Sequence, residues 1–383
     1  MSNFFKTITD SLSSAFHKET VDSVLGIDIG SSSVKVVQLR KKNGKAILET
    51  YGALSLGPYA NTDIGTVTNL PTDILAKALI DVLKESNTTT SNGALAIPSI
   101  ASLIFLVTLP GNISESELVN IIPVEARKYV PVPIAEVTLD WWMLPNQELI
   151  EQDSPSTNMA MATDGQMPKA RNTDTEVLVV AIHNDTLAKY RELLTASSID
   201  SHFFEMEIFS AIRSSFSYEL APVLFMDFGA SKTKVTIIEY GVVKSFHIIN
   251  RGSTDITRNI ATSMNISFKE AEDLKRSVGL NKSSNQSVAQ IVEISMDYIL
   301  SETNAIVQGY QKKYNKAISK IIMMGGGSQT NGLAEKVSGF FAIEVVYANP
   351  FAKVEAPAFL DPILKQSGPE FAVAVGLALR QLS

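Results

Sequence analysis

The spacing of hydrophobic positions predicts a chain that begins with strands. Residues 24–29, 34–40 and 46–55 carry the short apolar runs and the alternation of apolar and polar positions that are typical of β-strands. The turn Lys41-Lys42-Asn43-Gly44 joins the last two, and its Asn-Gly pair favours a tight hairpin. We expect the basic residues of this turn to form a solvated hairpin tip.

Helices and further strands follow along the rest of the chain. Apolar residues three and four apart predict helices at residues 70–86, 114–128, 185–196, 207–217, 253–263, 267–278, 287–314 and 369–382. Strands are predicted at residues 94–98, 102–109, 136–144, 176–183, 223–228, 232–240, 243–251 and 320–324. Ser114 and Glu117 have the spacing of a capping box at the start of one helix.

Two segments differ from this pattern. In the first 20 residues the apolar side chains share one helical face, namely Phe4, Phe5, Ile8, Leu12, Ala15 and Phe16. Such a helix either packs on the protein or lies in the plane of a membrane, where its few basic residues predict a weak attraction to anionic lipid. The polar residues at about 145–175 show no period and predict a mobile loop.

The composition favours a folded protein and excludes several kinds of site. Hydrophobic residues make up 45% of the 383 residues, which allows sizeable cores. The net charge of −7 argues against a protein that binds nucleic acid mainly through phosphate contacts. The absence of cysteine excludes disulfides, thiolate metal sites and cysteine nucleophiles. No apolar run reaches the roughly 20 residues of a membrane span, so we expect a cytoplasmic protein.

An internal repeat is the most informative feature of the sequence. Residues 25–39 (LGIDIGSSSVKVVQL) recur as residues 224–238 (LFMDFGASKTKVTII), at the constant offset of 199 that separates Asp28 from Asp227. The identical pairs are Leu25 and Leu224, Asp28 and Asp227, Gly30 and Gly229, Ser32 and Ser231, Lys35 and Lys234, and Val36 and Val235. Each copy predicts a strand, a tight Asp-x-Gly-x-Ser turn and a returning strand.

The repeated turn suits a phosphate group. Gly30 and Gly229 let the backbone approach an anion closely, and the serines and threonine that follow add amides and hydroxyls. Asp28 and Asp227 would repel a bare phosphate, but they suit a Mg²⁺ ion that is bound through water. One such turn alone is ordinary turn chemistry. Two copies at a fixed offset favour a clamp for the phosphates of a nucleotide.

A third motif follows the strand predicted at residues 320–324. The run Gly325-Gly326-Gly327-Ser328 leads from this strand into a helix. Glycines there allow a flat adenosine to lie on the backbone, while the start of the helix offers N–H donors. The alternative is a tight connection between strand and helix, for which one glycine is enough.

The three motifs, in this order, resemble those of the actin-like ATPase superfamily, which includes actin, the heat-shock chaperone ATPases, sugar kinases, FtsA and MreB. Further stretches resemble the PilM family of type IV pilus assembly proteins, namely ISESEL, EARKYVPVPIAEVTLD, ANPFAKV and PEFAVAVGLALR. The resemblance extends from residue 24 to residue 380. It implies an α/β fold with two RNase H-like (actin-like ATPase) domains around a nucleotide cleft, and an FtsA/PilM-type subdomain inserted in the first.

The resemblance also implies a division of the chain. An N-terminal amphipathic segment at 1–20 precedes a first domain at 21–222, which contains the inserted subdomain at about 111–184. The second domain covers 223–383, with a helical subdomain at about 252–318.

ATP and Mg²⁺ are the implied ligands of the cleft. The resemblance assigns the metal, through water, to Asp28 and Asp227. It assigns the phosphates to Gly30, Ser31, Ser32, Ser33 and Lys35 on one side, and to Gly229, Ala230, Ser231, Lys232 and Thr233 on the other. Further nucleotide contacts are implied for Gly252, Ser253, Asp255, Glu272, Lys275, Gly325, Gly326, Gly327 and Ser328. Glu207 is the candidate catalytic residue, because the resemblance implies that it orients the attacking water.

Simpler interpretations remain open for several of these residues. Lys35 is alternatively a solvated strand residue, and Glu207 an exposed glutamate that the helix dipole favours in the first turn. Glu272 and Lys275 have the spacing of an ordinary surface pair on a helix. No residue argues for fast turnover, so we expect at most a slow ATPase.

The resemblance implies a partner as well. A groove beside the inserted subdomain would receive the cytoplasmic N-terminal tail of the inner-membrane protein PilN, with Ile122, Ala126, Tyr129 and Val130 as candidates and core packing as the alternative. The protein would then link the PilN/PilO complex to the pilus motor ATPases, at the inner face of the cytoplasmic membrane. Competing interpretations are a filament-forming protein of the FtsA or MreB type and a small-molecule kinase of the same fold.

Overall fold

The computed structural model describes residues 23–111, 113–144, 174–201, 203–217 and 219–383. The predicted amphipathic helix at 1–20 lies outside the described residues, and so does nearly all of the loop predicted at about 145–175. The described residues group into two compact units: a small unit at 101–187 and a large unit at 23–100 and 188–383. The domain boundaries implied by the family resemblance remain predictions.

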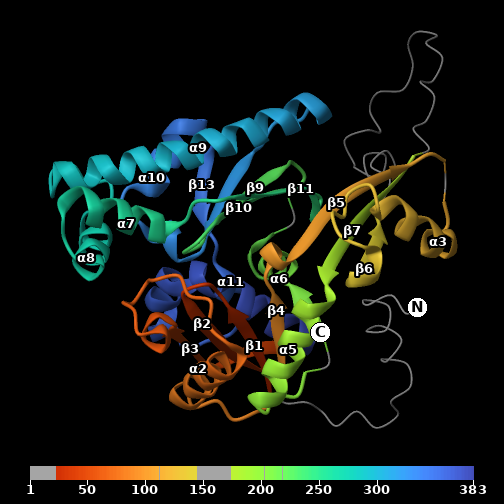
Figure 1. The fold of residues 1–383 in the computed structure, drawn as a ribbon, viewed down its shortest axis with the longest axis horizontal. Coiled ribbons are helices and arrows are strands. Elements are labelled where there is room, and N and C mark those ends of the chain that lie inside the picture. Colours follow the sequence, from red (N-terminus) through yellow and green to blue (C-terminus); the bar gives the residue numbers. More distant parts are fainter. Residues whose placement is uncertain (1–22, 112, 145–173, 202, 218) are drawn as a thin grey trace. The chain divides into compact units, whose positions relative to one another are not determined.

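The first sheet of the large unit contains the first copy of the repeat (Figure 1). Its strand order is β3-β2-β1-β4-β8, with bounds β1 (Ser23–Ile29), β2 (Ser33–Lys42), β3 (Lys45–Ser55), β4 (Gly93–Ile97) and β8 (Phe204–Met206). The three strands β1, β2 and β3 are antiparallel, whereas β4 and β8 run parallel to β1. The hairpins predicted from the alternation of apolar residues are therefore confirmed.

The second sheet of the large unit repeats this topology. Its order is β11-β10-β9-β12-β13, with bounds β9 (Val223–Phe228), β10 (Thr233–Glu239), β11 (Val242–Ile249), β12 (Lys320–Met324) and β13 (Glu344–Tyr347). Again three antiparallel strands are followed by two parallel ones. The internal repeat of the sequence is thus a repeat of the fold, in which β1 and β9 hold the same central place.

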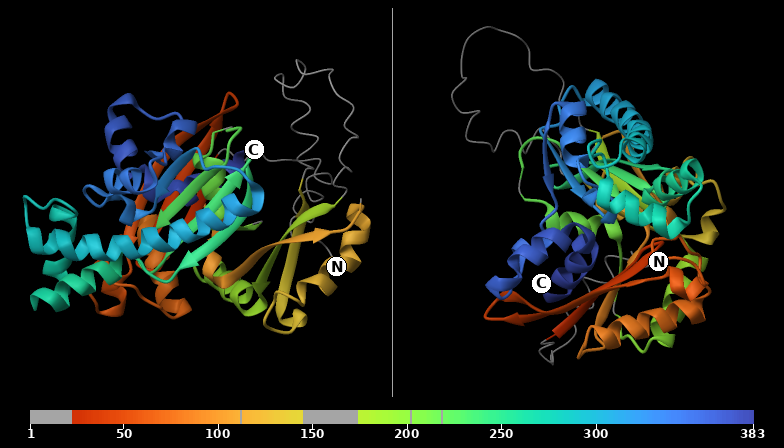
Figure 2. Two further views of the ribbon diagram at one scale, coloured as in Figure 1. Left: turned by 90° about the horizontal axis from the view of Figure 1, so that it is seen from above. Right: turned by 90° about the vertical axis from the view of Figure 1, so that its left-hand side faces the viewer.

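Helices cover these sheets. They are α2 (Thr72–Glu85), α5 (Asn184–Ala196), α6 (Glu207–Ser215), α7 (Ser253–Met264), α8 (Phe268–Val278), α9 (Gln286–Tyr314), α10 (Leu333–Phe341) and α11 (Asp361–Leu382). Short 3₁₀ turns lie at Gly57–Ala60, Ser99–Ala101, Ile134–Glu136, Gly326–Gln329, Pro350–Lys353 and Ala358–Leu360. The helices α7, α8 and α9 pack on one another, in the teal part of Figure 2. In the part of the chain that the structure describes, no helix is long and apolar enough to cross a membrane.

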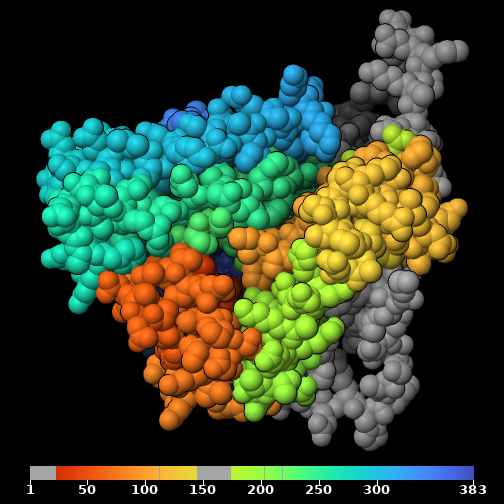
Figure 3. Space-filling view, in the orientation of Figure 1, coloured from red at the N-terminus to blue at the C-terminus, as the bar shows by residue number. Residues whose placement is uncertain are grey.

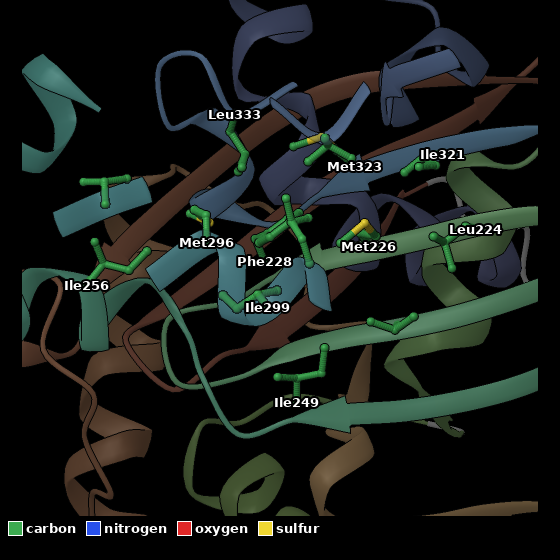
Figure 4. Close-up of a cluster of buried hydrophobic side chains, with 14 of the residues drawn as sticks. Leu224, Met226, Phe228, Ile249, Ile256, Met296, Ile299, Ile321, Met323 and Leu333 are labelled. Carbon is green, nitrogen blue, oxygen red and sulfur yellow. The ribbon is translucent and has the colours of Figure 1, made fainter. Parts of the chain in front are cut away.

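Among the described residues, two hydrophobic clusters stabilise the large unit. One lies against the second sheet, where Met226 and Phe228 of β9 meet Met296 of α9 and Leu333 of α10 (Figure 4). The other places the apolar face of α11 against β1 and β2. Gly26 of β1 allows this contact, because a Cβ atom there would lie 1.9 Å from a backbone oxygen of α11. Close packing of this kind leaves little freedom for the strands that end at the cavity described below.

The small unit is an antiparallel sheet with one helix. The sheet has the order β5-β7-β6, with bounds β5 (Ser102–Leu109), β7 (Thr175–His183) and β6 (Val137–Met143), and the helix is α3 (Glu115–Ala126). The predicted capping box is confirmed, since the Ser114 N–H donates to Glu117 at 2.8 Å. Leu118 and Ile122 of α3 pack on buried valines of β5 and β7.

Three elements differ from the sequence prediction. Helix α11 begins at Asp361 rather than at residue 369, because Pro362 starts the helix and Pro369 lies inside it. The carbonyl of Pro369 accepts a hydrogen bond from the Gly325 N–H at 2.9 Å, and most of the residues that follow Pro369 are buried, so tertiary packing holds the helix together through this proline. The strands β8 and β13 were not predicted, because they have three and four residues and show no alternation long enough to detect.

Candidate functional site

The two repeated hairpins present the same turn. In the first, the Gly30 N–H donates to the Ser33 carbonyl at 2.9 Å, and in the second the Gly229 N–H donates to the Lys232 carbonyl at 3.0 Å. The strand register places Asp28 directly across from Lys35, and Asp227 directly across from Lys234. Each hairpin therefore brings one carboxylate and one ammonium to the same end of its sheet, next to a turn rich in N–H groups.

Both hairpins open into one cavity of about 1040 Å³ in the large unit. Figure 3 shows the surface of the large unit hollowed between its orange and its green parts. The predicted nucleotide-binding residues that line the cavity are Asp28, Gly30, Ser31, Ser32, Ser33, Lys35, Asp227, Gly229, Ala230, Ser231, Lys232, Ser253, Glu272, Lys275, Gly325, Gly326 and Gly327, and Glu207 lines it too. The cavity is at the upper end of the sizes that hold small ligands, which reach about 1,000 Å³.

Four of the predicted residues are not among those that line the cavity: Thr233, Gly252, Asp255 and Ser328. The Thr233 hydroxyl donates to the Arg251 carbonyl at 2.9 Å, and the Gly252 N–H donates to the Asp255 carboxylate at 2.9 Å. The Ser328 hydroxyl donates to the carbonyl three residues before it. These residues hold the loops around the cavity in shape, and a direct contact of theirs with nucleotide remains a prediction.

The first hairpin carries a carboxyl group with a strongly perturbed pKa. Asp28 is buried, and the Lys35 ammonium lies 3.9 Å from its Oδ2 while it also donates to Ser33 Oγ at 3.0 Å. Burial raises the pKa of Asp28 to about 6, and the Glu207 carboxylate adds to this while Lys35 opposes it. Lys35 lines the cavity with a largely buried side chain, so it is not a solvated strand residue.

Glu207 lies at the start of α6 and is buried rather than exposed. Its Oε1 accepts a hydrogen bond from the Ser99 N–H at 2.6 Å, and its Oε2 lies 2.8 Å from Lys234 Nζ. Lys234 also lies 3.0 Å from Asp227 Oδ2. Burial alone would lower the pKa of Lys234, but the two carboxylates raise it well above its usual range. The interpretation of Glu207 as an exposed first-turn residue is therefore wrong.

The glycine run after β12 makes close contacts that a side chain would prevent. Gly325 has a φ angle of +81°, and a Cβ atom there would lie 2.3 Å from Asp227 Oδ1. A Cβ atom on Gly327 would lie 2.8 Å from the Phe228 carbonyl oxygen. The run therefore crosses directly over the end of β9, which explains why more than one glycine is needed there.

A buried polar cluster lies on the α7 and α8 side of the cavity. Lys275 Nζ donates to Glu272 at 2.6 Å and to the Thr257 hydroxyl at 2.9 Å, and that hydroxyl donates to Glu272 at 2.6 Å. Arg276 donates to the other carboxylate oxygen at 2.7 Å. The pKa of Glu272 is lowered because these donors outweigh its burial. The pair Glu272 and Lys275 is thus buried, not an ordinary surface pair.

Several further residues line the cavity although no role was predicted for them. Lys234 is detectable from the repeat, as the counterpart of Lys35. Tyr190 of α5 and Gly65 lie in no motif, and only the folded chain brings them here. The segment at Gly65 is held against α7, since the Thr254 hydroxyl donates to the Gly65 carbonyl at 2.9 Å.

The oxygen atoms of this site fit Mg²⁺ only if the ion is bound through its water ligands. Asp28 and Asp227 offer the oxygen atoms that this ion prefers, but each is paired with a lysine. Among the described residues, no group of three or more acidic or histidine side chains could hold a metal ion. The two aspartates would therefore hold such an ion through its water ligands.

The candidate partner residues lie on the small unit. Ile122, Ala126 and Val130 are buried, the first in the core beneath α3, which favours the alternative of core packing for these three. Tyr129 is 46% exposed, and its ring stacks on Phe105 with the centroids 4.5 Å apart. Of the four candidates, Tyr129 alone offers a large exposed surface to a partner.

Comparisons with known proteins bear on both the fold and the family. The family described as type IV pilus assembly protein PilM matches residues 26–382. The solved structure of a PilM-PilN type IV pilus biogenesis complex is similar with a TM-score of 0.76, at 22% identity over 95% of this chain and 99% of that chain. The ethanolamine utilization protein EutJ from Carboxydothermus hydrogenoformans has a TM-score of 0.51, at 14% identity over 93% of this chain and 89% of that chain. These similarities confirm the predicted α/β fold of the actin-like ATPases.

Proposed function

The chain belongs to the family of type IV pilus assembly protein PilM, and on this premise we propose that it is an ATP-binding adaptor of a pilus assembly machine. The observation that best supports a nucleotide site is the repeat itself. Two turns 199 residues apart in the sequence, together with the glycine run, line a single cavity. No simple structural role requires both turns to line the same cavity.

In this proposal, different residues of the cavity bind different parts of the nucleotide. The two turns bind the β- and γ-phosphates, with Lys35 and Lys232 as cations. Gly325, Gly326 and Gly327 receive the adenosine, while Glu272 and Lys275 bind on its other side. Mg²⁺, when bound, neutralises charge on the phosphates, and Asp28 and Asp227 hold its water ligands.

Glu207 is the residue that we propose to orient a water molecule for hydrolysis. Its carboxylate is held on both oxygens, by the Ser99 N–H and by Lys234. A carboxylate with these partners is fixed in position, and both of its oxygens already have a protein partner. We therefore propose slow hydrolysis, so that the nucleotide marks a state of the protein. A Glu207→Gln variant with an unchanged single-turnover rate would remove Glu207 from this role.

The partner that we propose is the cytoplasmic tail of PilN, bound by the small unit near Tyr129. Exposed aromatic residues that lie on a firm apolar base are common anchors for a peptide, and Tyr129 lies on Phe105. Through PilN and PilO the protein would be peripheral to the inner face of the cytoplasmic membrane, and it would connect them with the pilus motor ATPases. Support for PilN comes from the PilM-PilN complex that the chain resembles.

Nucleotide binding is tested with a fluorescent ATP analogue and the full chain. Lys35→Gln removes an ammonium from the cavity, and we expect about tenfold weaker binding, since a hydrogen bond to a charged group is worth about 1.5–3 kcal/mol. Lys42→Gln is the matched control, because Lys42 is exposed at the far end of the same strand. Failure of the unchanged protein to bind would contradict the proposed function.

Partner binding is tested with a labelled peptide of the PilN tail, titrated with and without Mg-ATP. We expect binding in the nucleotide-bound state and a different affinity in its absence. No binding in either state would contradict the adaptor proposal, while leaving the nucleotide site intact.

A further inference from the structure

Lys234 is the cation that lies between two carboxylates of the cavity. Its Nζ lies 2.8 Å from Glu207 Oε2 and 3.0 Å from Asp227 Oδ2. The side chain is 19% exposed and lines the cavity. It therefore has the two properties needed to act on a bound anion, namely a fixed position and a surface that faces the ligand.

The two copies of the repeat differ at this point. Lys35, the counterpart of Lys234, lies 3.9 Å from its own aspartate and donates to Ser33 rather than to a second carboxylate. In the second copy, α6 brings Glu207 to the lysine from 27 residues before it in the chain. Because Glu207 is itself held by the Ser99 N–H, Lys234 is bound on two sides by fixed groups. The second hairpin thus carries a positive charge that is held in place before any ligand arrives.

The charges around Lys234 determine how it affects the binding of phosphates. Asp28, Asp227 and Glu207 are three acidic groups on the cavity wall, and Lys35 and Lys234 are the ammonium groups paired with them. Without Lys234 the phosphates of a nucleotide would face Asp227 and Glu207 with no fixed cation between them. Apart from Lys35 and Lys232 in the two turns, a divalent ion would then be needed to offset that repulsion.

We propose that Lys234 is a built-in counter-cation of the phosphate site, which supplies beside the bound phosphates part of the positive charge that a divalent ion supplies. The inference rests on the proposed nucleotide site and adds a residue and a property to it. Lys234 keeps the acidic wall from repelling the phosphates when no divalent ion is present. It also competes with a divalent ion for Asp227, so the ion adds less affinity than it would in a site without this lysine.

Both effects change one measurable ratio, the dissociation constant in EDTA divided by that in Mg²⁺. A fluorescent ATP analogue is titrated into the full chain under both conditions, for the unchanged protein, Lys234→Gln and the control Lys42→Gln. We expect Lys234→Gln to weaken binding in EDTA about tenfold, as for the loss of one charged hydrogen bond, and to change binding in Mg²⁺ about twofold or less. The ratio then rises about fivefold or more, and Lys42→Gln leaves it unchanged.

Lys234→Gln leaves Asp227 and Glu207 without their cation and could misfold for that reason. A second variant therefore separates the loss of Lys234 from misfolding. Glu207→Gln/Lys234→Gln keeps the net charge of the pair, and we expect it to raise the same ratio, with thermal unfolding as the check on folding. Equal weakening in EDTA and in Mg²⁺, or no weakening, overturns the role of Lys234 and leaves the nucleotide site standing. Absence of binding by the unchanged protein in both conditions overturns the proposed function together with this inference.

Discussion

Asp28 is expected to destabilise the protein at neutral pH, and its replacement by asparagine to stabilise it. The carboxyl group is buried at the end of β1, where ionisation is opposed by burial and by the nearby Glu207 carboxylate. Its pKa is raised from 3.8 to about 6 in the folded protein. An asparagine side chain would have nearly the same shape and would carry no charge, so Asp28→Asn removes the cost of ionisation with little change in packing.

The sign and the size of this stability change follow from proton linkage. Between about pH 4 and pH 6 the folded protein holds a proton on Asp28 that the unfolded chain has released, so stability falls as the pH rises through this window. The favourable contribution is complete below pH 4 and lost above pH 6. A shift of about two pKa units, at about 1.4 kcal/mol for each, amounts to roughly 3 kcal/mol. Asp28→Asn should therefore gain up to about 3 kcal/mol over the unchanged protein at pH 7.5.

The assay is urea unfolding of the full chain at several pH values from 4 to 8, without nucleotide and with EDTA. The difference in unfolding free energy between Asp28→Asn and the unchanged protein should be small at pH 4, grow to pH 6 and then stay constant. Other carboxyl groups with shifted pKa values, such as Glu205 and Glu272, are present in both proteins and cancel in this difference. The difference therefore reports Asp28 itself.

The repeat offers a matched control. Asp227 occupies the equivalent place in the second hairpin, but it is paired with Lys234 at 3.0 Å. Asp227→Asn should destabilise the protein by about 1–3 kcal/mol, because it weakens a partly buried ion pair. Opposite signs for the same substitution at equivalent positions would support the reasoning. An Asp28→Asn variant that is no more stable at pH 7.5, or a difference that does not change from pH 4 to pH 7, would refute it.

Three further predictions concern contacts that the structure makes explicit. Gly325→Ala should lower the stability by about 2 kcal/mol or more and weaken nucleotide binding, because its Cβ atom would lie 2.3 Å from an Asp227 oxygen. The control Gly339→Ala, in open space on α10, should instead raise the stability by up to about 1 kcal/mol when both variants are compared by thermal unfolding and nucleotide titration. Gly376→Ala should cost about 3 kcal/mol in urea unfolding, because its Cβ atom would lie 1.8 Å from a backbone oxygen of α6, and an unchanged unfolding midpoint would count against the packing of α11 on α6. Tyr129→Ala should weaken binding of the PilN peptide about tenfold and lower stability by only about 0.5–1.5 kcal/mol, through loss of the stack on Phe105. Ile122→Ala should cost about 2–5 kcal/mol of stability, and peptide binding that Tyr129→Ala leaves unchanged would place the partner surface elsewhere.

Some of the cavity could be predicted from the residues alone. A strand, a tight turn and a returning strand necessarily place Asp28 across from Lys35, because side chains in an antiparallel pair meet at fixed register. The same local geometry holds for Asp227 and Lys234. Capping boxes are equally local, and the one at Ser114 was predicted correctly. Features of this kind depend on a few neighbouring residues and survive in any context that allows the strand or helix to form.

Other parts of the site depend on contacts between distant segments. The pairing of Glu207 with Lys234, the burial of Glu272 and the approach of Gly65 to α7 each join elements with no common pattern. Burial decided which of the candidates on and just after α3 can face a partner, since Ile122 and Ala126 are in the core and Tyr129 is not. Periodicity describes the face of a helix as apolar, but it does not say whether that face is covered.

The sequence by itself determined the repeated hairpins, their aspartates and glycines, and the family that they resemble, because these follow from short-range turn and strand geometry. The tertiary structure decided which charges meet. Lys234 became the partner of two carboxylates, and Asp28 became a buried acid, only when α6 and the second sheet closed the cavity around them. Electrostatic energies depend on distance and on exclusion of water, and both are properties of the folded chain rather than of any segment.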